Sequence, residues 1–217
     1  YLTWLGHAIQ GDFGISLAKQ IPVSDFIFPK FWNTAILTLT SALLAYIVGF
    51  FVGIMAAAKP YSFFDRSSMG LTLVFGNAPP YWLGLILVFI FSIHWRIFPA
   101  TGMTSMVGGG GIVDIIHHLV LPTITTAAAP AAIITRMVRA SMLEVLNQDY
   151  IKVARAMGVN KNLILRKHAL RNALPPIATI CGLQLGYLLG GALFSEVIFA
   201  WPGIGHQLFY AIMGRDI

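Results

Sequence analysis

The chain has 217 residues, of which 57% are hydrophobic and only 10% are charged. A soluble domain of this length carries charge on about a quarter of its residues, so this composition leaves too little charge to cover a water-exposed surface. Four stretches contain no Asp, Glu, Lys or Arg, namely residues 34–58, 67–93, 115–135 and 173–195. Each reaches or exceeds the roughly 20 residues that a helix needs to cross a bilayer. The composition argues against a soluble helical bundle, whose helices need a polar face, and predicts an all-α membrane protein with four spans.

The segments outside these stretches differ in charge. Residues 136–172 contain eight Lys and Arg residues against Glu144 and Asp149, and the short link 59–66 has one excess basic residue. The segments 1–33, 94–114 and 196–217 are neutral or slightly acidic. Because Lys and Arg concentrate on the cytoplasmic side of spans, we expect the two basic segments to face inward and the other three to be extracytoplasmic.

The start of the sequence bears on the number of spans. The first ten residues lack the basic start and apolar core of a signal peptide. A chain that begins outside the cell without a signal peptide needs at least one earlier span. We therefore expect a span that precedes this sequence.

Several other functions find no support in the residue pattern. A nucleic-acid surface interleaves basic and aromatic residues, but Tyr150 is the only aromatic residue in the basic segment. The adjacent His117 and His118 project in different directions from a helix, so we expect no metal site. The sequence contains no G-x-x-x-x-G-K-[ST] motif, so ATP binding is not expected in this chain. The single cysteine, Cys181, is interpreted as a small packing residue.

A short amphipathic helix is predicted inside the basic segment. Asp149 is a suitable N-cap, the helix is expected to run from Tyr150 to about Met157, and Gly158 is the expected stop. Helical spacing places an apolar set on one side (Tyr150, Val153, Ala154 and Met157) and Lys152 and Arg155 on the other. Such a helix suits either docking to a partner protein or lying on lipid headgroups, and the pattern alone leaves both interpretations open.

The sequence around this helix resembles a known family. The run DYIKVARAMGVNKNLILRKHALRNALPPI (residues 149–177) is similar to the cytoplasmic loop of ABC importer permeases of the peptide, opine and nickel family. The resemblance includes GDFGIS at 11–16, RASMLEVLNQDY at 139–150, FAWPGIG at 199–205 and GRD at 214–216, so it covers nearly the whole chain. In the loop, the family's small-residue pair, glycine and leucine–proline correspond to Ala154, Ala156, Gly158, Leu174 and Pro175. The chain departs from the family at Lys152, where a glutamate is usual, and at Val153, where an alanine is usual.

The resemblance implies a type I ABC importer permease fold with six spans, one before and one after this sequence, and a cytoplasmic coupling helix. It assigns docking to an ATPase to one set of residues: Asp149, Tyr150, Val153, Ala154, Arg155, Ala156, Met157 and Gly158. The implied partners are a homologous second permease, two ATP-binding subunits that carry ATP and Mg, and an extracytoplasmic substrate-binding protein. The chain itself is then no enzyme. It is expected in the bacterial inner membrane, where it imports di- or oligopeptides, or alternatively nickel or opines, by alternating access.

Polar and small residues within the spans have two interpretations each. Asn77 and Gln184 need a partner at membrane depth, so they either line the pore or form hydrogen bonds between helices. Glycines four residues apart, at Gly49 and Gly53 and at Gly182, Gly186 and Gly190, allow close helix packing either within the chain or between subunits.

Two other classes of membrane protein remain as alternatives. A secondary transporter needs an ionisable residue inside a span for ion coupling, and the four uncharged stretches contain none. A membrane scaffold that transports nothing has no need of the docking loop.

Overall fold

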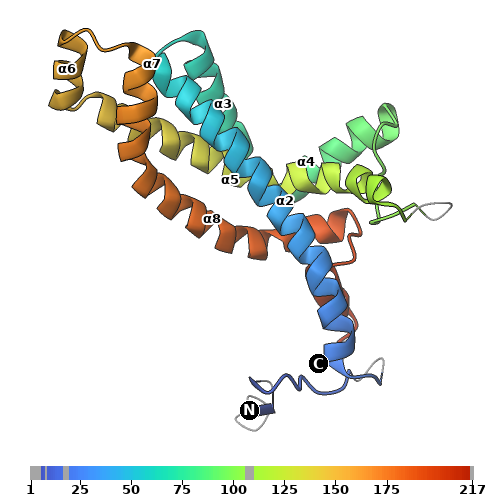
Figure 1. Ribbon diagram of the computed structural model, residues 1–217. Coiled ribbons are helices and arrows are strands. Elements are labelled where there is room, and N and C mark those ends of the chain that lie inside the picture. Colours follow the sequence, from blue (N-terminus) through green and yellow to red (C-terminus); the bar gives the residue numbers. More distant parts are fainter. Residues whose placement is uncertain (1–5, 8, 17–19, 106–109, 216–217) are drawn as a thin grey trace. The chain divides into compact units, whose positions relative to one another are not determined.

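The computed structural model in Figure 1 describes residues 6–7, 9–16, 20–105 and 110–215. Asp216, in the GRD motif, lies outside the described residues. Within these ranges the protein is helical, and its only β-type pairing is an isolated bridge between Ile15 and Pro22. The elements are α2 (Val23–Ala58), α3 (Phe63–Asn77), α4 (Pro80–Leu87), η1 (Val88–His94), α5 (Ile112–Leu146), α6 (Asp149–Ala156), α7 (Lys161–Leu163), η2 (Ile164–Ala169), α8 (Leu170–Ile198) and α9 (Ile204–Met213). The all-α expectation is confirmed.

Three helices are long and apolar enough to cross a membrane: Val23–Ala58, Ile112–Leu146 and Lys161–Ile198. A fourth span results if α3 and the segment Pro80–His94 are counted together as one broken span. The break falls where Ala78 takes an extended conformation before the pair Pro79–Pro80. A proline disfavours helical geometry in the residue before it and suits the first position of a new helix, so the Pro-Pro pair explains the break.

The helices are longer than the uncharged stretches of the sequence. Helix α5 continues to Leu146 and carries two arginines, Arg136 and Arg139, in its last three turns. The pair Pro175–Pro176 lies inside α8. An uncharged stretch shows where a helix can contact hydrocarbon, whereas the helix itself continues until capping residues end it.

The chain divides into two compact units, each described here by itself. The first unit comprises Tyr1–Leu39, Pro80–Thr125 and Leu189–Ile217, and the second comprises Thr40–Pro79 and Thr126–Leu188. In the second unit, α2, α5, α6, η2 and α8 share a core of apolar side chains: Ala45, Ala57, Ala127, Ile134, Val138, Met142, Leu146, Ile151, Ile164, Ala169, Ala173 and Ile177. A smaller core in the first unit contains Leu37, Leu119, Ala192 and Trp201.

The two glycine sets behave differently. A Cβ atom at Gly49 would lie 2.6 Å from Ile134 Cγ2, and one at Gly53 would lie 2.7 Å from Val138 Cβ, so these glycines let α2 and α5 pack closely within the chain. A Cβ atom at Gly182, Gly186 or Gly190 would meet no described atom within 4 Å. Packing inside the chain therefore accounts for the first pair but not for the glycines of α8.

The predicted orientation can be tested by labelling single cysteines in a Cys181→Ala background. Gly111 and Asn160 are both exposed, and the charge distribution assigns them to opposite sides of the membrane. We expect Gly111→Cys to react with an impermeant thiol reagent added outside, and Asn160→Cys to react only when the reagent reaches the cytoplasm. Reaction of both cysteines from outside would contradict the orientation.

Candidate functional site

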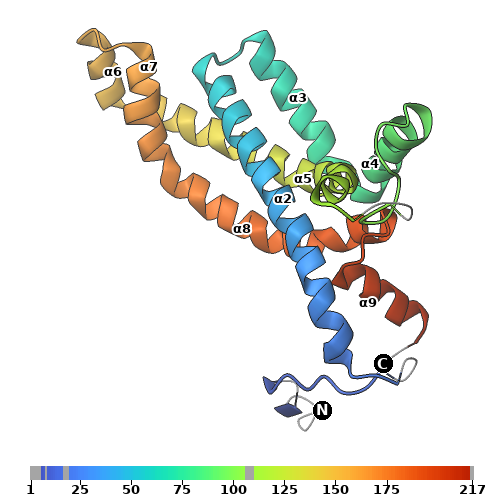
Figure 2. The ribbon, with the colours of Figure 1, turned by 45° about the vertical axis from the view of Figure 1, so that its right-hand side comes forward.

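Helix α6 connects the end of α5 to the start of α7, and Figures 1 and 2 both show α6 beside α7. The residue before its first turn is Gln148, whose backbone is extended and whose side chain makes no capping hydrogen bond. Asp149, expected as the N-cap, is instead the first helical residue. There its carboxylate accepts a 2.8 Å hydrogen bond from Lys152 Nζ and lies favourably at the positive end of the helix dipole. Asp149 is a residue type that suits both the N-cap and the first turn, so residue type alone does not fix where α6 begins.

The end of α6 follows a recognised backbone motif. Gly158 has a φ of +79°, which residues with a side chain rarely adopt. Its N–H donates to the carbonyl of Arg155 at 3.0 Å, and the N–H of Val159 donates to the carbonyl of Ala154 at 3.1 Å. These two bonds form a Schellman motif, which satisfies carbonyls that the helix end leaves free. Gly158 therefore ends the helix, as the sequence predicted.

One face of α6 packs against the rest of the second unit. Ile151 is fully buried and belongs to the core with Leu146, Ile164 and Ala169. Ala154, one turn later, also packs against this core. Ala154 was predicted on the apolar side of the helix, whereas Ile151 had no predicted role. The structure instead uses Ile151 and Ala154 to hold α6 on its own chain.

The adjoining face of α6 carries exposed apolar side chains. Tyr150, Val153 and Met157 are 45%, 57% and 73% exposed, and their spacing places them on one side of the helix. We call these three residues the docking face. Lys152 and Ala156 are also exposed. Large apolar groups that face outward beside a basic surface are typical of a protein or membrane contact.

A hydrogen bond joins α6 to the start of α8. The side-chain amide of Asn172 donates to the hydroxyl of Tyr150 at 2.8 Å. Tyr150 therefore belongs to the docking face and also contacts a long candidate span. Together with the buried Ile151, this bond attaches α6 to the segments that precede and follow it.

A buried ion pair lies in the same unit, between α3 and α5. The guanidinium of Arg139 donates two hydrogen bonds to the carboxylate of Asp65, and the bond from Nη2 is 2.7 Å long. Only 2% of the Asp65 side chain is exposed. One turn earlier on α5, Arg136 donates to the carbonyl of Thr72 at 2.9 Å, where Gly76 leaves room for the guanidinium. In the sequence, Asp65, Arg136 and Arg139 contribute only to the charge balance of their segments. No local pattern predicts that Asp65 and Arg139 form an ion pair.

The two residues proposed for the pore have different surroundings. Asn77 is exposed at the end of α3, and its side-chain amide donates to the carbonyl of Leu73 in the same helix at 2.6 Å. Gln184 is buried in α8, and its Oε1 atom has no hydrogen-bond partner among the described residues. The hydrogen bond of Asn77 is therefore local and does not join two helices. Pore lining stays a prediction for both residues.

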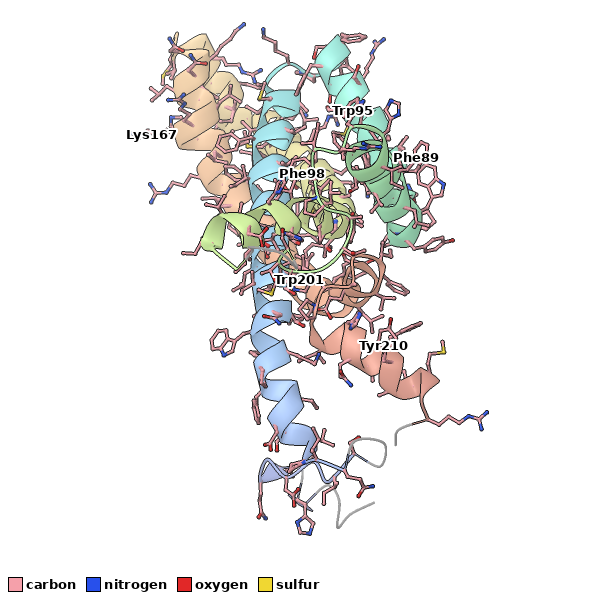
Figure 3. All side chains as sticks on the ribbon, turned by 90° about the vertical axis from the view of Figure 1, so that its right-hand side faces the viewer. Phe89, Trp95, Phe98, Lys167, Trp201 and Tyr210 are labelled. Atoms are coloured by element: carbon pink, nitrogen blue, oxygen red, sulfur yellow. The ribbon has the colours of Figure 1, made fainter. Side chains whose placement is uncertain are left out.

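The first unit contains a polar cluster built from the FAWPGIG motif. Glu196 is fully buried; its carboxylate accepts hydrogen bonds from the Thr34 hydroxyl at 2.6 Å and the backbone N–H of His206 at 3.0 Å. The indole of Trp201 donates to the carbonyl of Asn33 at 2.8 Å, and the Asn33 amide donates to the carbonyl of Pro202 at 2.9 Å. Figure 3 labels Trp201 in the turn between α8 and α9. The cluster thus fastens α2, α8 and α9 to one another.

Metal binding has no structural support in the described part of the chain. No group of three or more His, Cys, Asp and Glu residues there could hold a metal ion. His117 Nε2 instead forms a 2.7 Å hydrogen bond with the carbonyl of Ile97, and His118 Nδ1 one of 2.9 Å with the carbonyl of Asp114. Burial lowers the pKa of His206, in α9, which favours its neutral form.

Comparison with known proteins decides the family. Residues 49–217 match the family of binding-protein-dependent transport system inner membrane components. The chain belongs to this family. Such a component is a permease in the bacterial inner membrane, so the expected class of protein and its location are confirmed.

Individual relatives agree with this assignment. The chain is 38% identical to the dipeptide transport system permease protein DppB of Escherichia coli K12, over all of this chain and 70% of that protein. It is 42% identical to the oligopeptide transport system permease protein AppB of Bacillus subtilis, over all of this chain and 69% of that protein. The glutathione transport system permease protein GsiC of Escherichia coli is 39% identical, over 98% of this chain and 66% of that protein.

The fold is shared with a solved transporter. An inward-facing structure of the MetNI methionine ABC transporter superposes with a TM-score of 0.65, over 86% of this chain and 80% of that chain. The two sequences are 20% identical, so this similarity concerns the fold alone. It confirms the type I importer permease fold that the family resemblance implied.

Proposed function

We propose that this permease imports short peptides, driven by separate ATP-binding subunits that dock on α6. The peptide cargo is supported by the relatives, which are described as dipeptide, oligopeptide and glutathione permeases. Import of nickel or opines by the same architecture is the alternative cargo. The further partners are a homologous second permease and an extracytoplasmic binding protein that delivers the substrate.

The observation that carries the docking proposal is the division of α6 into two faces. Ile151 and Ala154 hold the helix on its own chain, while Tyr150, Val153 and Met157 remain exposed. A partner that covers these three side chains gains the free energy of burying apolar surface. Lys152, where the chain departs from the family, is exposed but is not one of these three side chains.

The mechanism follows from how α6 is attached. A partner that moves when it binds and hydrolyses ATP displaces the docking face. Ile151 passes this displacement to the core formed with α5, and Tyr150 passes it to Asn172 at the start of α8. Alternating access then depends on differential contacts of the partner with two states of the permease.

The docking proposal is tested by placing a charge on the docking face. Val153→Glu adds a carboxylate at a position that is 57% exposed, so the permease itself is expected to fold. Burial of this charge against a partner is unfavourable, and we expect at least tenfold weaker association with the ATP-binding subunit and a matching loss of uptake. The measurements are a pull-down of that subunit and uptake of a labelled dipeptide.

The matched control is Leu163→Glu, which adds the same charge in the same loop at a side chain that is 49% exposed. It lies outside the docking face and should retain association close to that of the parent. If both variants bind the ATP-binding subunit as the parent does, α6 is not the coupling element. If Val153→Glu and Leu163→Glu lose binding equally, association depends on the total charge of the loop and not on the docking face.

A further inference from the structure

A short link, residues 59–62, joins α2 to α3 within the second unit (Figures 1 and 2). Two aromatic side chains at this link are almost completely uncovered: Tyr61 is 77% exposed, and Phe63, the first residue of α3, is 88% exposed. Lys59 and Arg66, which flank them in the sequence, are exposed as well. Eight consecutive residues thus present two aromatic rings and two cations outward.

Hydrogen bonds hold the backbone of this link in place. Tyr61 has a φ of +62°, which a bulky residue rarely adopts, and its N–H donates to the carboxylate of Asp65 at 2.8 Å. The N–H of Asp65 donates to the hydroxyl of Ser62 at 3.2 Å, so these bonds form a reciprocal cap at the start of α3. Asp65 is itself fixed by Arg139 of α5. The exposure of the two rings is therefore a feature of a strained and well-supported backbone.

Helix α3 is polar on its buried side and apolar on its exposed side. Its buried residues are Asp65, Ser68 and Thr72. Phe63, Gly70 and Val74 are exposed, and their spacing of seven and four residues places them on one face. A helix in water shows the reverse arrangement, so the exposed face of α3 suits lipid. Gly70 and Val74 belong to the uncharged stretch 67–93, and Phe63 extends the same face beyond that stretch.

The uncharged stretches place the link at the edge of the hydrocarbon. The stretch in α2 ends at Ala58, and the stretch in α3 begins at Ser67. Arg136 and Arg139 of α5 do not mark contact with water, because both bond to groups of α3. The charge distribution assigns this edge to the cytoplasmic side. Aromatic rings and long cationic side chains are the groups that a membrane–water interface favours.

We propose that Tyr61 and Phe63 are seated in the headgroup region of the cytoplasmic leaflet, with Lys59 and Arg66 beside lipid phosphates. We call Tyr61 and Phe63 the interface anchor. The rival occupant of this surface is the ATP-binding subunit, because α6 belongs to the same unit. Lipid is favoured because Phe63 continues the exposed apolar face of a candidate span. The anchor does not depend on docking at α6, so the two proposals can fail separately.

The test measures the depth of a nitroxide label at Phe63→Cys in a Cys181→Ala background. The assembled transporter is placed in liposomes of phosphatidylethanolamine and phosphatidylglycerol. Power-saturation electron paramagnetic resonance then compares collisions of the label with oxygen, which concentrates in lipid, and with a water-soluble nickel chelate. We expect an oxygen-to-chelate ratio between those of nitroxide lipids labelled at the headgroup and at the upper acyl chain in the same liposomes.

The matched control is Leu163→Cys, which replaces another exposed apolar side chain of the same unit, in the loop beyond the uncharged stretches. Its oxygen-to-chelate ratio should be several-fold lower than that at Phe63. Equal ratios at the two sites would overturn the anchor, because the label at Phe63 would then be no closer to lipid than the loop is. Rare collisions with both reagents at Phe63 would show a protein contact, assign the surface to the ATP-binding subunit and also overturn the proposal.

Discussion

The Arg139→Ala permease is expected to lose on the order of 3 kcal/mol of folding stability, because it leaves a buried carboxylate without its counter-ion. Asp65 has a side chain that is 2% exposed and receives two hydrogen bonds from the Arg139 guanidinium. The backbone N–H of Tyr61 also donates a hydrogen bond to the Asp65 carboxylate, at 2.8 Å. The measurement is thermal unfolding of the purified protein in detergent, with recovery from the membrane as a second readout.

A double-mutant cycle separates the ion pair from other effects of the substitution. Asp65→Ala alone leaves the guanidinium unpaired, whereas the combination of Asp65→Ala and Arg139→Ala leaves neither charge. We therefore expect the double variant to lose less stability than the two single losses added together. Arg136→Ala is the matched control on the same helix. Among the described residues Arg136 donates to a carbonyl and has no ion pair, so a smaller loss is expected. Additive losses would show that the two residues do not act as a pair.

The helices of this protein are predictable from local sequence because their causes are local. Long uncharged stretches require helices in lipid, the Pro79–Pro80 pair breaks one of them, and Gly158 ends α6 in a left-handed conformation. Each of these effects is determined by residues within a turn or two. The same reasoning predicted that α6 is a short amphipathic helix.

Which face of α6 is buried could not be predicted from the same information. Helical spacing places Ala154 between Tyr150 and Ile151, so the apolar and small residues of α6 form one continuous surface. Only the contacts with Ile164 and Ala169, on a later segment, identify Ile151 as the buried anchor. The ion pair of Asp65 with Arg139 spans 74 residues, and the bond of Thr34 with Glu196 spans 162. Such pairs depend on tertiary packing, which a single sequence does not encode in any local pattern.

The glycine sets illustrate the same limit. Gly49 and Gly53 share their spacing with Gly182 and Gly186, yet only the first pair meets a neighbouring helix within the described chain. Spacing shows that a close approach is possible, whereas the presence of a partner depends on the rest of the fold.

Replacing Glu196 by alanine should release the first turn of α9. The buried carboxylate accepts hydrogen bonds from the Thr34 hydroxyl and the His206 N–H, and its removal leaves both donors without this acceptor. We expect a loss of about 3 kcal/mol in stability, because each unsatisfied buried donor costs about 1–3 kcal/mol. Hydrogen–deuterium exchange at residues 204–206 should become much faster than in the parent, since the first turn of α9 loses its hydrogen bond to α8.

Two further variants decide whether the hydrogen bonds of Glu196 cause this effect. Glu196→Gln retains a carbonyl oxygen for one N–H, but its amide group faces Thr34, whose hydroxyl oxygen already accepts from the N–H of Ile204 at 2.9 Å. An exchange rate between those of the parent and Glu196→Ala is therefore expected. Gly203→Ala should reproduce the faster exchange, because its Cβ atom would overlap the Glu196 carboxylate, whereas Gly182→Ala, whose Cβ atom meets nothing within 4 Å, should not. Parent-like exchange in Glu196→Ala would mean that the remaining contacts, among them the hydrogen bonds of Trp201 and Ile204, are enough to hold α9.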